Sequence, residues 1–270
     1  MNLGFEQFEN ARKIRIPSIC EELAEDIGIQ IGDGSVNYRK SNKDKGSYRI
    51  QVYGNITEDK HYLIDFVKPL KEKLFGIKVY SNENRVAGTI FLTIYSKNLV
   101  YFYNSLGFPI GPKINIKIPS FILMNKKLQI SCLRGLIDTD GTLAFRKGDY
   151  PDYSFPIVKF SSKSKDLCSQ VCRILDNLDL SYTVQFDIKQ YDKRTRKIYI
   201  KNEVCIQGKK NLEKWMKIIG FHNIAQITKY LVYKKLGYCL PRTTLEQRLN
   251  ILKKEKMGQE GFEFGICQKI

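Results

Sequence analysis

The 270-residue sequence has few of the residues that build disulfide frameworks or zinc fingers. It contains seven cysteines, an odd number without a Cys-x-x-Cys pair, and two histidines. Such cysteine usage is typical of reduced intracellular thiols, and a His/Cys zinc site is disfavoured for want of ligands. No run approaches 18 apolar residues, and the N-terminus lacks the apolar core of a signal peptide. We therefore expect an intracellular protein without a membrane partner, in a cytoplasm, nucleoid or organelle matrix.

Acidic residues are also scarce relative to basic ones. Lys and Arg total 45 against 28 Asp and Glu, so the net charge is +17. A surplus of this size predicts an anionic partner, with nucleic acid ahead of a membrane surface. The 43% of apolar residues can build one large core or two small ones.

The chain repeats itself. "DGSVNYRK", which begins at Asp33, and "DGTLAFRK", which begins at Asp140, are identical at four of eight positions, and three more are conservative exchanges. Matching segments flank both copies: "RIPSI" (15–19) with "KIPSF" (117–121) upstream, and "NLVYFYNSLGF" (98–108) with "NLEKWMKIIGF" (211–221) downstream. Two copies with so long a period indicate a duplicated domain rather than a solenoid.

The pattern of apolar residues predicts the same order of elements in each copy: helix, two strands, helix, two strands, helix. Pro69 is expected to kink the second helix of the first copy. We predict a first repeat over 15–108, a linker rich in Gly and Pro over 109–126, a second repeat over 127–236, and a C-terminal helix with a Thr N-cap and a tail over 237–270.

Small residues recur every four positions before each Asp-Gly pair, which predicts two helices that pack closely side by side. The two stripes are Ala24, Gly28 and Gly32, and Ser131, Gly135 and Thr139. Both helices then end together, with Asp33 next to Asp140. Carboxylates are unfavourable at helix C-termini and repel one another, and a divalent cation would relieve both effects. The alternative is that Asp-Gly is an ordinary helix-ending turn, with Gly at a positive φ.

The segment "LRGLIDTDG" (133–141) closely resembles the LAGLIDADG motif of the homing endonuclease family, and "DIGIQIGDG" (26–34) looks like a diverged first copy. The resemblance covers about residues 15–236. It implies an α+β fold of tandem, pseudo-symmetric αββαββα repeats, with the motif helices at the interface. Two curved antiparallel four-stranded sheets would form a DNA-binding saddle.

The resemblance also implies a metal-dependent site. Asp33 and Asp140 would bind Mg²⁺ (or Mn²⁺), helped by the carbonyls of Gly32 and Thr139. The family places a basic residue near each cleavage centre, after the last helix of each repeat. Lys113 fits the first position, whereas the second holds Gln226. Because Gln226 stands where a lysine is expected, the two centres are expected to be unequal. Lys229 is the alternative basic residue for the second centre.

Strand residues that face away from the helices are the predicted DNA contacts, because Arg, Lys and Gln read bases and hold phosphates. They are Asn37, Arg39, Arg49, Gln51, Arg146, Lys159, Gln185 and Lys189, with Thr89, Thr93 and Thr183 on the same faces. The alternative is that these residues form an ordinary solvent-exposed sheet face, but this does not explain the net charge of +17.

These observations favour a monomeric, site-specific double-strand DNA endonuclease, encoded by a mobile intron or freestanding, with a long pseudo-palindromic or asymmetric target. The alternative is a non-cleaving binder of the same fold, either an intron maturase or a transcription regulator. Retention of both motif acids favours the nuclease and leaves intron RNA open as an added partner.

Overall fold

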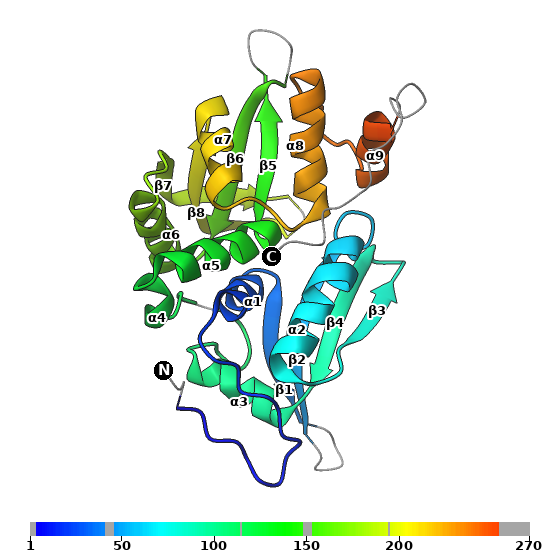
Figure 1. Cartoon of the computed structure of the whole chain (residues 1–270), viewed down its shortest axis with the longest axis vertical. Coiled ribbons are helices and arrows are strands. Elements are labelled where there is room, and N and C mark those ends of the chain that lie inside the picture. The colour runs from blue at the N-terminus through cyan, green and yellow to red at the C-terminus, as the bar shows by residue number, and fades with distance from the viewer. Residues whose placement is uncertain (1–3, 41–45, 114, 148–152, 194, 254–270) are drawn as a thin grey trace.

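A computed structural model of the chain describes residues 4–40, 46–113, 115–147, 153–193 and 195–253. Its architecture is α+β, with two units that follow one another along the chain (Figure 1). The first unit consists of α1 (Glu21–Ile31), β1 (Gly34–Arg39), β2 (Ser47–Asn55), the π-helix η1 (Tyr62–Val67), α2 (Lys68–Phe75), β3 (Tyr80–Asn84), β4 (Thr89–Tyr95) and α3 (Lys97–Ser105).

The second unit repeats this order after a short connecting helix. Its elements are α4 (Ser120–Leu123) in the connection, α5 (Lys126–Thr139), β5 (Gly141–Arg146), β6 (Phe155–Ser162), α6 (Lys165–Asn177), β7 (Thr183–Asp192), β8 (Lys197–Gln207) and α7 (Lys209–Ile218), followed by α8 (Ile224–Leu236) and α9 (Leu245–Lys253). The order predicted from the sequence repeat is therefore confirmed in both units, whereas the exact domain boundaries stay a prediction.

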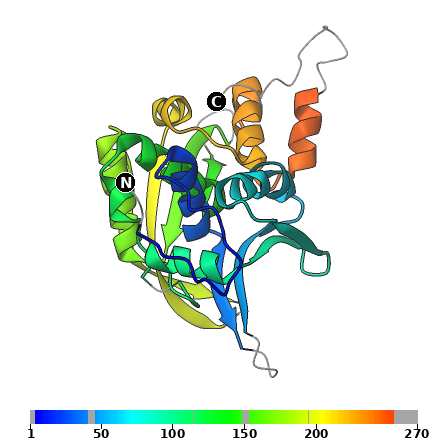
Figure 2. The ribbon, with the colours of Figure 1, turned by 60° about the horizontal axis from the view of Figure 1, so that its bottom comes forward.

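Each unit forms one antiparallel four-stranded sheet. The strand order is β1-β2-β4-β3 in the first unit and β5-β6-β8-β7 in the second. Alternate strand residues on the helix-facing side, such as Val36, Leu92 and Leu143, are buried in the core, as their period of two predicts. Among the described residues, the opposite side of each sheet is left without a covering helix. Figure 2 shows this arrangement from another side, with β1 and β2 extending away from the central helices.

The helix around Pro69 differs from the single kinked helix that the sequence predicts. Residues Tyr62–Val67 adopt a π-helix, and α2 starts directly after it with Pro69 in its first turn. Proline has no N–H to donate and is tolerated in the first turn of a helix. The helix type therefore changes just before Pro69, whereas the predicted kink stays a prediction.

The C-terminal helix α9 begins at Leu245, directly after a threonine, as the sequence predicts. Thr244 Oγ1 accepts the N–H of Gln247 at 3.2 Å, and Gln247 Oε1 accepts the N–H of Thr244 at 2.8 Å, which is a reciprocal capping box. Residues 254–270, which hold the end of the predicted helix and the tail, lie outside the described residues. Among the described helices, none is long and apolar enough to cross a membrane.

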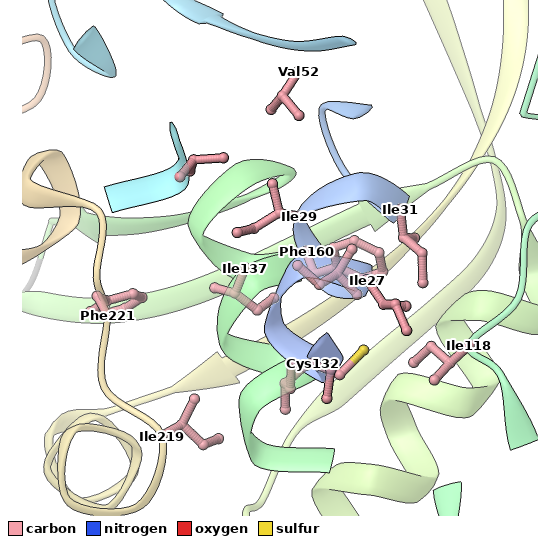
Figure 3. Packing of buried hydrophobic residues seen from close by; sticks show 14 of the residues in the cluster. Ile27, Ile29, Ile31, Val52, Ile118, Cys132, Ile137, Phe160, Ile219 and Phe221 are labelled. Carbon is pink, nitrogen blue, oxygen red and sulfur yellow. The ribbon is translucent and has the colours of Figure 1, made fainter. Parts of the chain in front are cut away.

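Helices α1 and α5 pack side by side and join the two units (Figure 1). A Cβ atom at Gly28 would lie 2.1 Å from the carbonyl oxygen of Cys132, and one at Gly135 would lie 2.3 Å from that of Glu25. Cys132 and Ile137 of α5 belong to the buried apolar cluster around this contact (Figure 3). The two predicted stripes of small residues therefore do bring the helix backbones together.

We expect Gly28→Ala to destabilise the fold by about 1–3 kcal/mol, the usual cost of overpacking. In an ordinary helix the same change stabilises by about 1 kcal/mol, because alanine is the better helix former. The sign of the change in the free energy of unfolding therefore shows whether the two helix backbones are in close contact at Gly28. Urea unfolding of the wild type, Gly28→Ala and the symmetry-related Gly135→Ala measures it, and a more stable Gly28→Ala would contradict the close approach of α1 and α5.

The glycines of the two Asp-Gly pairs serve a purpose other than a left-handed turn. Gly34 and Gly141 are not among the glycines with positive φ. A Cβ at Gly34 would lie 2.4 Å from the side chain of Gln30, and one at Gly141 would lie 2.7 Å from the carbonyl oxygen of Ile137. Because each glycine has no side chain, the first strand of each unit can pass close to the last turn of its motif helix. This close approach fixes the position of the preceding aspartate.

A buried ion pair anchors α1 to its own unit. Lys71 of α2 lies 2.6 Å from Asp26 Oδ1 and donates to Gln30 Oε1 at 3.2 Å and to the Tyr103 hydroxyl at 3.0 Å. Tyr103 in turn donates to the second oxygen of Asp26. Because both charges are fully buried, loss of either partner would leave the other uncompensated. This network holds the helix that ends at Asp33.

Candidate active site and nucleic-acid interface

The two motif aspartates lie at the adjoining ends of α1 and α5. Asp33 directly follows the C-cap Gly32 of α1, and Asp140 is itself the C-cap of α5. Desolvation, followed by the neighbouring carboxylates of Asp140 and Asp59, raises the pKa of Asp33 to about 7, against a smaller lowering by Lys113. Desolvation also raises the pKa of Asp140, which Lys113 lowers. Asp33 is half-buried and Asp140 exposed, so the pair is open to a ligand.

Lys113 lies at this pair. Its ammonium donates to the carbonyl oxygens of Ile31 at 2.6 Å and of Gly32, and so caps the C-terminus of α1. Burial lowers the pKa of Lys113, while Asp140 and Asp33 raise it. The carbonyl of Gly32, a predicted metal ligand, already accepts this ammonium, so Lys113 would compete with a metal there.

The corresponding corner of the second unit is built differently. Gln226 is buried, and its Oε1 accepts the backbone N–H of Leu143 at 2.9 Å. Lys229 donates to the same Oε1 and to Thr142 Oγ1, both at 3.3 Å. Lys229 therefore does reach the start of β5, although Gln226 serves to hold that strand.

The charges around Lys229 differ from those around Lys113. Burial is the main cause that lowers the pKa of Lys229, and Arg248 lowers it further, while Glu58 and Asp59 are among the acids that raise it. By contrast, the acids that raise the pKa of Lys113 are the two motif aspartates. The second unit thus has no equal of Lys113 among the described lysines of this corner.

Asp59 is a third acid of the site, and the sequence analysis missed it. Its Oδ2 accepts the N–H of Asn55 at 2.8 Å, and its Oδ1 accepts Asn223 Nδ2 of the second unit at 3.0 Å. Asp33 and Asp59 line one shallow cavity together with Asn55 and Thr89. At the spacing of the repeat the counterpart of Asp59 is Asp166, an exposed carboxylate paired with Lys117, so the repeat pattern does not single out Asp59 as a site residue.

The pKa of Asp33 predicts how stability depends on pH when no cation is bound. Because this pKa is about 7 in the folded chain against an ordinary 3.8, the folded state holds the proton more tightly. The resulting stabilisation is full below about pH 4 and is lost as the pH rises through about 7. Urea unfolding in excess chelator should therefore show a free energy of unfolding that falls over this range. Asp33→Asn is expected to remove part of that slope, and an unchanged slope would contradict the assignment.

The predicted DNA-facing residues mostly lie on the outer faces of the sheets. In the first sheet Asn37 pairs with Arg49, Gln51 pairs with Thr93, and the outer face continues through Tyr53. In the second sheet a cavity opens on the outer face and is lined by Arg146, Lys159, Thr183, Gln185, Glu203 and Gln207. Arg39 also lies on the outer face of the first sheet, beyond the Asn37 pair.

The prediction that Lys189 shares the face of Gln185 is wrong. Gln185 pairs with Glu203, but a β-bulge follows, and Ile188 rather than Asp187 takes the next outer position opposite Lys201. Lys189 pairs with Ile200 on the other face. One extra residue in a strand reverses the alternation of all residues beyond it.

The outer-face residues are already organised by contacts with one another. Gln51 donates to Thr93 Oγ1 at 3.2 Å. Arg146 donates to Gln207 Oε1 at 3.0 Å, and Lys159 lies 2.6 Å from Glu203. Side chains held in this way lose less conformational freedom on binding, although Lys159 must exchange its carboxylate partner to hold a phosphate.

Fold and site together define a two-repeat α+β protein with paired carboxylates at the junction of the repeats. Residues 127–220 match the LAGLIDADG-like domain. The homing endonuclease I-DmoI, solved in complex with DNA and Ca, superposes with a TM-score of 0.53 at 19% identity, covering 74% of this chain and 88% of that one. A mutant of I-SmaMI gives a TM-score of 0.50 at 11% identity, covering 89% of this chain and 94% of that one.

Two curated relatives extend the comparison. An uncharacterized protein of Methanocaldococcus jannaschii is 30% identical over 180 residues, 65% of this chain and 61% of that protein. An A-type ATP synthase subunit of Pyrococcus abyssi is 29% identical over 152 residues, 55% of this chain and 13% of that protein. The chain thus spans about three-fifths of the first relative and a small part of the second. It has the LAGLIDADG fold and carries a LAGLIDADG-like domain in its second repeat.

Proposed function

We propose that the protein is a site-specific DNA endonuclease that cuts both strands of its target, with a divalent cation held by Asp33 and Asp140. The supporting observation is the pair itself: two carboxylates lie close enough at the ends of packed helices for Asp140 to help raise the pKa of Asp33 to about 7. Intron homing and an intracellular location are proposed with this function. The cation would be Mg²⁺ or Mn²⁺.

The residues of the pair fit such a cation. They offer carboxylate oxygens, and among the described residues Lys113 is the cation that lowers the pKa of both; hard divalent cations prefer oxygen ligands. A bound cation would supply an activated water and would neutralise charge on the leaving oxygen. Lys113 would contribute an ammonium beside the scissile phosphate, and Asp59 would adjust the protonation of Asp33. The exposed side of Asp140 leaves room for DNA.

Duplex DNA is the proposed partner because both outer sheet faces carry polar side chains on a strongly basic chain. Structures with a similar fold include I-DmoI in complex with DNA and Ca, and I-DmoI in complex with DNA and Mn. Since one chain holds both sheets, we propose that it acts as a monomer. The two outer faces differ at most positions, so the target would be asymmetric or at most pseudo-palindromic.

Affinity for DNA should fall steeply with salt, by about 0.9 in log–log slope for each phosphate neutralised. Two sheets that each cover roughly one helical turn should protect about 20 bp. Filter binding across a salt series and footprinting measure the two quantities. A footprint of half that length, or a perfectly palindromic optimum, would contradict a monomer that uses both sheets.

Selection from a randomised duplex library tests the function without knowledge of the target. The wild type, in Mg²⁺, should enrich fragments that are cut at one motif, with both strands cleaved. The Asp33→Asn/Asp140→Asn double variant, which is otherwise identical to the wild type, should yield no cleaved fragments. Enrichment by binding but not by cleavage in the wild type would favour the non-cleaving alternative.

A role in RNA binding, as in an intron maturase, is the second candidate, and one feature of the first sheet favours it. Tyr53, Tyr80 and Tyr95 are each more than two-fifths exposed on its outer face. Exposed aromatic rings stack on unpaired bases in single-stranded RNA. Tyr95→Ala is therefore a discriminating variant: it would weaken binding to structured intron RNA far more than binding to duplex DNA if the chain has this role.

A further inference from the structure

A second cluster of ionisable side chains lies at the α1–α5 interface, apart from the motif aspartates. Glu25 of α1, Asp138 of α5 and His222, which follows α7, each place one ligand atom within 4.8 Å of the others. Asp138 precedes Asp140 by two positions, so the two side chains leave the helix about 200° apart. Asp138 therefore leaves α5 on a different side from the motif aspartate Asp140.

The three side chains are oriented by specific contacts. His222 Nδ1 lies 2.5 Å from Glu25 Oε1, and the other oxygen of Glu25 accepts Arg134 at 3.1 Å. Arg134 is fixed in turn by the carbonyl of Ile219 at 2.7 Å. Asp138 Oδ2 accepts the backbone N–H of His222 at 2.7 Å. The cluster thus has the supporting hydrogen bonds that orient ligands in protein metal sites.

Two buried polar atoms of this region have no hydrogen-bond partner among the described residues. They are Asp138 Oδ1 and the hydroxyl of Tyr62, and both residues are 2% exposed. Tyr62 stacks on Phe66, whose ring lies 4.4 Å from that of His222. An unpartnered buried polar atom has lost its water without gaining another partner, and unsatisfied groups of this kind are rare in native proteins. A ligand at this position would satisfy Asp138.

We propose that Glu25, Asp138 and His222 bind a zinc-type transition-metal ion that joins the two repeats. One imidazole nitrogen and two carboxylate oxygens form a ligand set that suits Zn²⁺ and its neighbours better than Mg²⁺, which prefers oxygen alone. The fourth position falls to a water or to the Tyr62 hydroxyl. The side chain of His222 is 26% exposed, so an ion can enter from its side.

The ion would fix the junction on which the cleavage site is built. It would connect α1 of the first repeat with α5 and the 219–223 segment of the second. That segment carries Asn223, which donates to Asp59 Oδ1 at 3.0 Å and to the carbonyl of Asp138 at 2.9 Å. The inference does not depend on nuclease activity, because a non-cleaving binder would have the same junction.

Spectroscopy with Co²⁺ as the zinc probe tests the site in the full chain. The protein is stripped with a chelator, returned to excess Mg²⁺ so that the oxygen sites are filled, and titrated with Co²⁺. We expect one equivalent to give the visible d–d absorption of four-coordinate Co²⁺, which Zn²⁺ then abolishes. A near-ultraviolet thiolate band would assign the ion to cysteine and overturn the proposal, as would the absence of any stoichiometric band.

The variants exploit the fact that the chain has two histidines. His222→Gln should weaken Co²⁺ binding by about 100-fold or more, since it removes a ligand. Asp138→Asn should also weaken it, while its amide oxygen can still accept the N–H of His222. His61→Gln, the matched control at the exposed histidine paired with Asp65, should leave binding unchanged. Unchanged binding in His222→Gln or in a folded Asp138→Asn would show that the cluster is only a hydrogen-bonded ion pair.

Discussion

Replacing Asp33 or Asp140 by asparagine should slow double-strand cleavage by at least about 10³-fold while leaving target binding nearly intact. Asparagine keeps the size of the side chain but removes the charge that would hold the cation. Binding should survive because the outer sheet faces, which carry the proposed DNA contacts, are separate from the pair. Conversion of supercoiled target plasmid and a gel-shift titration in Ca²⁺ measure cleavage and binding separately.

Asp65→Asn provides the matched control for these variants. Asp65 is an exposed carboxylate paired with His61, and it lies in η1 rather than on a strand, so its loss should change neither quantity. If Asp33→Asn or Asp140→Asn still linearises plasmid at the parental rate, the pair is not the cleavage site. A loss of binding as large as the loss of cleavage would assign the aspartates to folding or DNA contact instead.

The second large effect is expected at Lys113. Its ammonium is held by the carbonyls of α1 beside both motif aspartates, and removal of a preorganised charged donor typically costs about 10²–10³ in rate. Lys113→Gln should therefore slow the first nick by that factor. Lys229→Gln should have a smaller effect, limited to the other strand, because Lys229 is held by Thr142 and Gln226.

Unequal centres should also appear in the wild type as a nicked intermediate that accumulates before linear product. A lysine at position 226 is a poor test of this idea, because it would lose the acceptor for Leu143 N–H and place a second cation beside Lys229. The time course of plasmid cleavage by the wild type, Lys113→Gln and Lys229→Gln is the direct measurement. Passage straight from supercoiled to linear DNA in all three would contradict the asymmetry.

Local signals in the sequence were sufficient for most of the fold. The duplicated Asp-Gly segments and their flanks predicted the order of elements in both repeats. The recurrence of small residues at Gly28 and Gly135 also predicted the helix contact that brings Asp33 and Asp140 together. These predictions succeeded because each depends on the spacing of residues along one helix or strand.

Features that depend on tertiary contacts could not be predicted in this way. Lys189 changed face because of a bulge at Phe186 and Asp187, which no local pattern announces. Asp59 joined the site through a bond from Asn223, 164 residues away in sequence. Gln226, taken as the counterpart of Lys113, is instead a support for β5. For Asp59 and Gln226 the deciding partner is remote in the chain.

Anomalous diffraction from crystals of the protein with its selected target DNA and Mn²⁺ tests the central claim most directly. The account predicts Mn²⁺ density within about 2.0–2.6 Å of carboxylate oxygens of Asp33 and Asp140, the usual range for hard divalent cations, with DNA lying on both outer sheet faces. Density at Glu25, Asp138 and His222 would be a separate result and would not substitute for it. Mn²⁺ bound away from both motif aspartates, with DNA in place, would contradict the account.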